Sequence, residues 1–196
     1  ETQRTAEREK ELAEARLKTE RLAFQKEKEE AERKARDGQM AAEREKMAAM
    51  ERKMAAMEKE KAMLADAAKI PETTIRSANG EMVLTLLAIN LFSSKNELHA
   101  QGKSLLDKVG IYLKKYSPGR IAVRGYADST GKAAENQALS EKRAQKVKEY
   151  LAVYQNIPAA NIAAEGLGAT QPVASNATDA GRALNRRVEI GIPIGQ

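Results

Sequence analysis

The chain has 196 residues, with 34 Lys and Arg, 28 Asp and Glu, and a formal net charge of +6. This length allows one ordinary domain plus an extension. The absence of Cys excludes disulfides and thiolate metal sites. No apolar run approaches the roughly 20 residues that a membrane-spanning helix needs. Residues 1–69 hold 18 basic and 17 acidic side chains and residues 70–196 hold 16 and 11, so the basic excess, which favours an anionic partner, lies in the second segment.

Residues 1–70 are predicted to form a charged helical extension. Strong helix formers dominate it, no Pro precedes Pro71, and opposite charges recur at three- and four-residue spacings. Asp37-Gly38 is the expected position of a kink or break.

A stripe of Met residues runs along the later part of this extension. Its members fall on the a and d positions of a heptad, and Lys61 interrupts the pattern. Three interpretations stay open: a solvated spacer helix, a coiled-coil dimer and a helical hairpin. The stripe consists of Met47, Met50, Met54, Met57 and Leu64.

A change of pattern after Pro71 indicates a linker over residues 71–81 and a domain over residues 82–196. Strands that alternate with helices favour βαβ units. We therefore expect an α+β fold, with a small mixed sheet and helices packed on one face, beside the long N-terminal helix or coiled coil. The predicted strands are 82–92, 120–126, 161–166 and 187–193, and the predicted helices are 97–116 and 134–155.

Four sequence blocks in the second segment occur in order and with close spacing. They are GYADSTG (125–131), NQALSEKRA (136–144), GLGATQP (166–172) and NATDAGRALNRRVEI (176–190). Together they closely resemble the OmpA-like C-terminal domain, the peptidoglycan-binding module of outer-membrane proteins, Pal-type lipoproteins and flagellar-stator proteins. The resemblance covers roughly residues 80–193.

The resemblance implies a binding protein that is not an enzyme and needs no cofactor or metal. Its expected partner is the diaminopimelate residue of the peptidoglycan stem peptide. By the family pattern, Asp128 holds the ammonium of this residue and Arg143 holds its carboxylate. Asn136 and Arg186 match residues that line the same pocket, and Ser94, in the loop after the first strand, is the fifth implied binding residue.

The chemistry of the ligand agrees with this assignment. Diaminopimelate ends in an ammonium and a carboxylate on one carbon, so its site needs an anion and a cation close together. A guanidinium can give a carboxylate two parallel hydrogen bonds. Arg143 follows Asn136 by seven residues, about two helical turns, so both lie on one face of the predicted helix. A plain salt bridge between Asp128 and Arg143 is the structural alternative.

Two residues depart from the family pattern, because Tyr126-Ala127 replaces the usual His-Thr before the Asp. We expect binding to survive, since Asp128 and Arg143 remain, but the preference between diaminopimelate and lysine-type peptides is open. Arg187 and Glu189 alternate on the last predicted strand and are expected to face solvent or each other.

Other function classes have weaker support. The single His99 is expected to be solvated or to cap a helix, and Ser129 and Ser140 have no base at catalytic spacing. Two Phe, five Tyr and no Trp leave little for base stacking, so nucleic acid is not an expected partner. The alternative to wall tethering is an oligomeric helical scaffold or periplasmic spacer whose domain has weak or altered ligand specificity. We expect a periplasmic location at the outer membrane of a Gram-negative bacterium, with membrane attachment only through segments absent from this chain.

Overall fold

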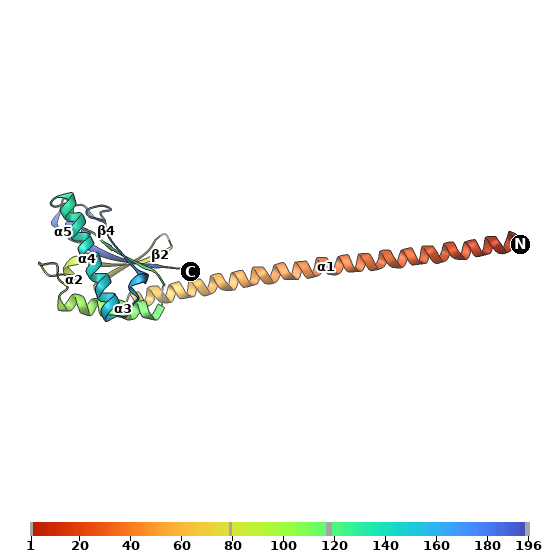
Figure 1. Ribbon diagram of the computed structural model, residues 1–196, viewed down its shortest axis with the longest axis horizontal. Coiled ribbons are helices and arrows are strands. Elements are labelled where there is room, and N and C mark those ends of the chain that lie inside the picture. Colours follow the sequence, from red (N-terminus) through yellow and green to blue (C-terminus); the bar gives the residue numbers. More distant parts are fainter. Residues whose placement is uncertain (1, 79, 117–118, 195–196) are drawn as a thin grey trace. The chain divides into compact units, whose positions relative to one another are not determined.

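The computed structural model describes residues 2–78, 80–116 and 119–194 (Figure 1). The chain divides into two compact units, Glu1–Ala55 and Ala56–Gln196. Within the described ranges, no helix is both long enough and apolar enough to cross a membrane.

Helix α1 (Thr2–Ala67) supplies the first unit with its residues up to Ala55, and it is helical through Asp37 and Gly38 without a break. The predicted break at this position is therefore wrong. A Cβ added at Gly38 would meet no atom within 4 Å, so this glycine serves no close approach. Glycine costs a helix only about 1 kcal/mol relative to Ala, which the strong helix formers around it can offset.

The second unit contains a five-stranded sheet in the order β1-β2-β5-β3-β4. All neighbouring strands are antiparallel except β3 and β4, which are parallel and are joined by α4 in a βαβ unit. The expected α+β fold is confirmed. The strands are β1 (Thr73–Ala78), β2 (Glu81–Leu87), β3 (Ile121–Gly125), β4 (Ile162–Gly166) and β5 (Arg187–Pro193). The helices are α2 (Ala88–Leu91), α3 (Ala100–Tyr116), α4 (Ala133–Tyr154), the 3-10 turn η1 (Ala159–Asn161) and α5 (Asp179–Asn185).

The predicted elements differ from the observed ones at three places. The first predicted strand, 82–92, ends at Leu87. This residue pairs with Arg187, the first residue of the antiparallel strand β5, so the pairing with β5 stops there. The next four residues form α2 instead. The segment 71–81, expected to be a linker, contains the edge strand β1, and helix α5 was not predicted.

The two faces of the sheet have different chemistry. On β5, Val188, Ile190 and Ile192 join the apolar core with residues of α3 and α4. The alternate residues of the same strand, Arg187 and Glu189, are also buried but form an ion pair with each other. Helices thus cover one face, and charged side chains gather on the other.

The end of α1 belongs to the second unit and packs into its core. Met63 and Ala67 are buried there, and the hydroxyl of Tyr112 donates to the carbonyl oxygen of Met63 at 3.2 Å. Asp66 accepts hydrogen bonds from Lys115, from Lys69 at 2.6 Å and from the hydroxyl of Tyr116 at 2.7 Å. The hydrogen bonds from Lys115, Lys69 and Tyr116, in that order of importance, hold the pKa of Asp66 well below its usual range.

We predict that Asp66→Asn lowers the free energy of unfolding at neutral pH. A carboxyl whose pKa is lowered by folding stabilises the protein above its unfolded pKa and loses this effect as pH falls through the folded value. The difference between Asp66→Asn and the wild type should therefore shrink on acidification. Urea unfolding across pH measures it, and equal profiles for Asp66→Asn and the exposed control Glu165→Gln would contradict the prediction.

Candidate functional site

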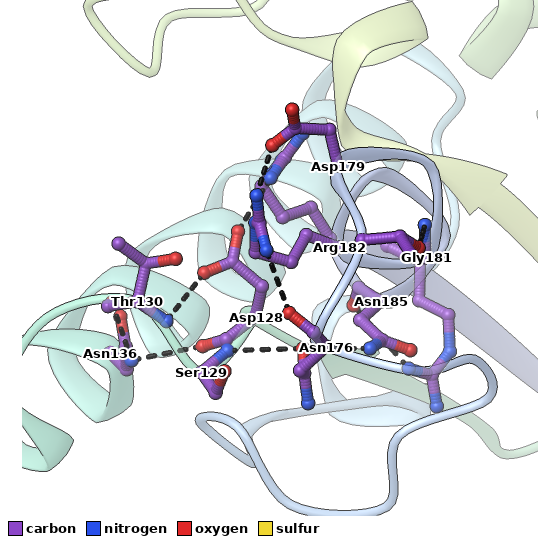
Figure 2. A network of polar contacts seen from close by, with 12 residues as sticks. Asp128, Ser129, Thr130, Asn136, Asn176, Asp179, Gly181, Arg182 and Asn185 are labelled. Carbon is purple, nitrogen blue, oxygen red and sulfur yellow. Dashed lines mark hydrogen bonds and ion pairs between the residues drawn. The ribbon is translucent and has the colours of Figure 1, made fainter.

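The loop between β3 and α4 carries Asp128. Its Oδ1 accepts a hydrogen bond from the backbone N–H of Thr130 at 2.7 Å, which closes an Asx turn. Asn136, in the first turn of α4, donates through its Nδ2 to the carbonyl oxygens of Asp128 and Thr130, each at 3.0 Å (Figure 2). Asn136 therefore fixes the conformation of this loop.

The second oxygen of Asp128 is paired with Arg186, which lies between α5 and β5. Arg186 Nη1 donates to Asp128 Oδ2 at 2.5 Å, and the side chain of Asp128 is 9% exposed whereas that of Arg186 is 41% exposed. Burial alone would raise the pKa of Asp128, but the hydrogen bonds from Arg186 and Thr130 outweigh it and hold the pKa below its ordinary value. Asp128 is thus a buried carboxylate that stays charged.

Arg143, on α4, is 8% exposed and is held mainly by the loop before α3. Its Nε and Nη2 both donate to Asn96 Oδ1, at 3.1 and 2.7 Å, and its Cζ lies 5.7 Å from the centre of the Phe92 ring. Among the residues that the structure describes, Arg143 Nη1 is the one buried side-chain nitrogen or oxygen without a hydrogen-bond partner. The hydrogen-bonding capacity of this guanidinium is therefore not fully used at Nη1.

The electrostatic environment of Arg143 is unfavourable for its charge. Burial lowers the pKa of Arg143, nearby Arg186 lowers it further, and Asp128 acts in the opposite direction. A buried charge that is paired only with a neutral amide oxygen is costly. A carboxylate placed at Nη1 would supply both the missing acceptor and the missing counter-charge.

The predicted site residues do not all come together. Asp128, Asn136 and Arg186 are in direct contact, and Arg143 interacts with Asp128 and Arg186 electrostatically. In the described part of the chain, Asp128 and Arg143 form no salt bridge, so that alternative is wrong. Ser94 is exposed in the Asn96 loop, and no hydrogen bond links it to the other four across the described ranges.

Asn96 contacts the candidate site residue Arg143, and the sequence did not predict this contact. Its φ is +58°, in the left-handed region that Asn tolerates better than most residues. Its backbone N–H donates to the carbonyl oxygen of Ser93, which closes a turn. In this turn its side chain lies against Arg143. An Asn in a short polar loop was the available signal, but only the fold brings this loop to α4.

A second polar network joins the α5 region to the Asp128 loop (Figure 2). Asn185 Nδ2 donates to Asn176 Oδ1 at 2.8 Å, and the same oxygen accepts from the backbone N–H of Ser129 at 3.3 Å. Thr178 caps α5 by accepting from the N–H of Gly181 at 3.1 Å. The residue before β5, Arg186, is consequently held in a defined position next to Asp128.

Tyr126, one of the two departures from the family pattern, packs on the charged face of the sheet. Arg187 Cζ lies 3.7 Å from the centre of the Tyr126 ring, and the Tyr126 hydroxyl is 3.4 Å from Glu189 Oε2. Arg187 and Glu189 face each other, as expected, at 2.8 Å. The larger ring of Tyr126 therefore serves this buried network.

Two glycines let α4 approach the ends of β3 and β4. A Cβ at Gly125 would lie 2.1 Å from the carbonyl oxygen of Ser140, and one at Gly166 would lie 2.3 Å from the backbone nitrogen of Glu141. Such distances leave no room for a side chain. Helix α4, which carries Asn136 and Arg143, therefore lies directly against the ends of β3 and β4. The loop that carries Asp128 begins at the end of β3.

Comparison with known proteins places the chain in a family. Residues 93–186 match the OmpA family, and the solved cell wall anchor of the T6SS from Pseudomonas aeruginosa is 33% identical, with a TM-score of 0.60 over 68% of this chain and 96% of that one. The chain belongs to the OmpA family.

Curated relatives are similar to this chain over part of their length. The chain is 35% identical over 131 residues to the probable lipoprotein YiaD of Escherichia coli. This match covers 66% of this chain and 59% of that protein. The chain is 45% identical over 86 residues to the peptidoglycan-binding protein ArfA of Mycobacterium tuberculosis, covering 44% of this chain and 26% of that one. The chain thus spans about a quarter to three-fifths of the length of these relatives.

We predict that Gly125→Ala destabilises the domain by about 1–3 kcal/mol, because the new methyl group overlaps a backbone oxygen that cannot move freely. Gly38→Ala is the matched control, since nothing lies within 4 Å of its added Cβ. It should leave the unfolding midpoint of the domain unchanged and raise the helical circular dichroism signal slightly. An unfolding midpoint for Gly125→Ala equal to that of the wild type would contradict the close packing of α4.

Proposed function

We propose that the domain binds peptidoglycan without cleaving it, through the diaminopimelate residue of the stem peptide, and tethers the outer membrane or an envelope complex to the cell wall. The observation that carries the proposal is the buried guanidinium of Arg143, whose Nη1 has no hydrogen-bond partner and whose charge has no carboxylate in contact with it among the described residues.

In this proposal Arg143 binds the carboxylate of the ligand. Asn96 already orients the guanidinium through Nε and Nη2. Little side-chain freedom therefore remains to be lost when a ligand binds. A hydrogen bond between two charged groups in a buried site is stronger than a neutral one.

Asp128 would bind the ammonium of the ligand. An ionised carboxylate has about four acceptor positions, and the bonds from Thr130 and Arg186 use one on each oxygen. Asn136 holds the loop in place, and Arg186, which is partly exposed, borders the site and keeps Asp128 ionised. Ser94 is proposed to contact the ligand from the exposed loop that also carries Asn96.

The relatives support the class of ligand. ArfA is named as a peptidoglycan-binding protein, and the Pseudomonas structure is that of a cell wall anchor. Other relatives are outer membrane proteins, such as outer membrane protein A of Bordetella avium, which is 45% identical over 98 residues. We accordingly assign this domain to the periplasm and to a binding role with no catalytic step. Because the wall is a polymer, several weak sites can act together and hold a membrane firmly.

We predict that the wild-type chain cosediments with purified sacculi of the diaminopimelate type, whereas Asp128→Asn and Arg143→Met stay largely in solution, with binding reduced at least about tenfold. Each variant removes one charge of the pair that the ligand requires, and loss of a charged hydrogen bond in a buried site has an effect of this size. Circular dichroism and the unfolding midpoint show whether each variant is folded.

Arg120→Ala is the control for a general effect of charge, because it also removes one cation but lies at an exposed position outside the site. It should bind sacculi like the wild type. Equal binding by all four proteins would show that the basic surface, and not this site, holds the wall.

A further inference from the structure

The Met side chains of α1 form an apolar stripe that the chain itself does not cover. Met47, Met50 and Met54 are 60%, 63% and 55% exposed, and Met57 is 59% exposed. They follow one another at spacings of three and four residues, so they lie on one face of the helix. Four large apolar side chains in a row on an exposed helix face indicate a contact surface for another helix.

The heptad pattern defines the extent of this stripe. Met47 and Met54 occupy a positions and Met50 and Met57 occupy d positions. Glu43 stands at the preceding d position and Lys61 at the following a position, so charged residues end the stripe on both sides. Beyond it, Met63 is buried in the core of the second unit and is not available.

The charges beside the stripe determine which partner fits. Lys46 and Lys53 occupy g positions, and Glu51 and Glu58 occupy e positions. All four side chains are exposed, and within the part of the chain that the structure describes none of them forms an ion pair. They are therefore free to pair with charges of another chain.

These charges distinguish the two possible orientations of a helix pair. In a parallel, in-register pair, each g residue faces the e residue of the next heptad on the partner, which sets Lys46 against Glu51 and Lys53 against Glu58. In an antiparallel pair, g faces g and e faces e, so contacts among these four residues would join Lys only to Lys and Glu only to Glu. Only the parallel arrangement makes every one of these contacts attractive.

We propose that α1 binds a second copy of this chain as a parallel, in-register, two-stranded coiled coil centred on Met47–Met57. The seam is short and is built from flexible Met side chains, so the dimer is reversible and depends on protein concentration. This inference is independent of peptidoglycan binding, because it uses none of the residues assigned to that site.

Disulfide trapping tests the proposal in the full 196-residue chain, which contains no Cys, so that each introduced Cys is the only thiol. Met47→Cys, Met50→Cys and Met57→Cys should each form covalent dimers under mild oxidation, at least about tenfold faster than Ala49→Cys, whose c position faces away from the seam. The four positions are exposed on the helix, so the folded domain is unaffected.

The pattern of trapping also tests the orientation. Positions 47 and 57 are about 15 Å apart along the helix, so an antiparallel pair cannot bring both into contact with themselves. Self-crosslinking at both positions supports the parallel dimer. Faster crosslinking between a mixture of Met47→Cys and Met57→Cys chains than within either variant overturns it, and so does crosslinking at all three seam positions that does not exceed that of Ala49→Cys.

A charge exchange gives a second, independent readout. The double variant Glu51→Lys/Glu58→Lys and the double variant Lys46→Glu/Lys53→Glu should each sediment as monomers at a concentration where the wild type dimerises. Their dissociation constants should rise at least about tenfold, and an equimolar mixture should form heterodimers. Unchanged self-association of both double variants would overturn the proposed register.

Discussion

The buried guanidinium of Arg143 is the feature on which the proposed site depends. Burial and the neighbouring Arg186 both disfavour its charge, while Asn96 accepts from its Nε and Nη2 and no described residue pairs with its Nη1. Removing a charged group from water is costly unless a partner compensates for it. The domain accepts this cost at a position beside a carboxylate, Asp128, and the arrangement is complementary to a ligand that carries both charges on one carbon.

The start of β5 separates two ion pairs, that of Arg186 with Asp128 and that of Arg187 with Glu189. Arg186 and Arg187 are consecutive, yet the first pairs with Asp128 whereas the second stacks on Tyr126 and pairs with Glu189. Because neighbouring residues at the start of a strand point to opposite sides, one dipeptide serves two networks. The network of Arg187 supports the sheet, and the bond between Arg186 and Asp128 keeps the carboxylate ionised.

Much of the fold followed from the sequence, because the strands and helices of the domain have strong apolar periodicity; the bounds of β5 were predicted without error. Strand β1 was missed, because an edge strand with polar residues carries little apolar signal. Asp128, Asn136 and Arg186 could be grouped from the family pattern. The role of Asn96 and the separate placement of Tyr126 could not, since both depend on contacts between segments distant in the chain.

The most direct test of the central claim is isothermal titration of the wild type and Arg143→Met with two stem peptides that differ only at the third residue, diaminopimelate or lysine. Lysine lacks the side-chain carboxylate that Arg143 is proposed to bind. The account predicts that the wild type prefers the diaminopimelate peptide by at least about tenfold, the usual effect of one charged hydrogen bond in a buried site, and that Arg143→Met loses this preference. Equal affinity of the wild type for both peptides would contradict the proposed role of Arg143.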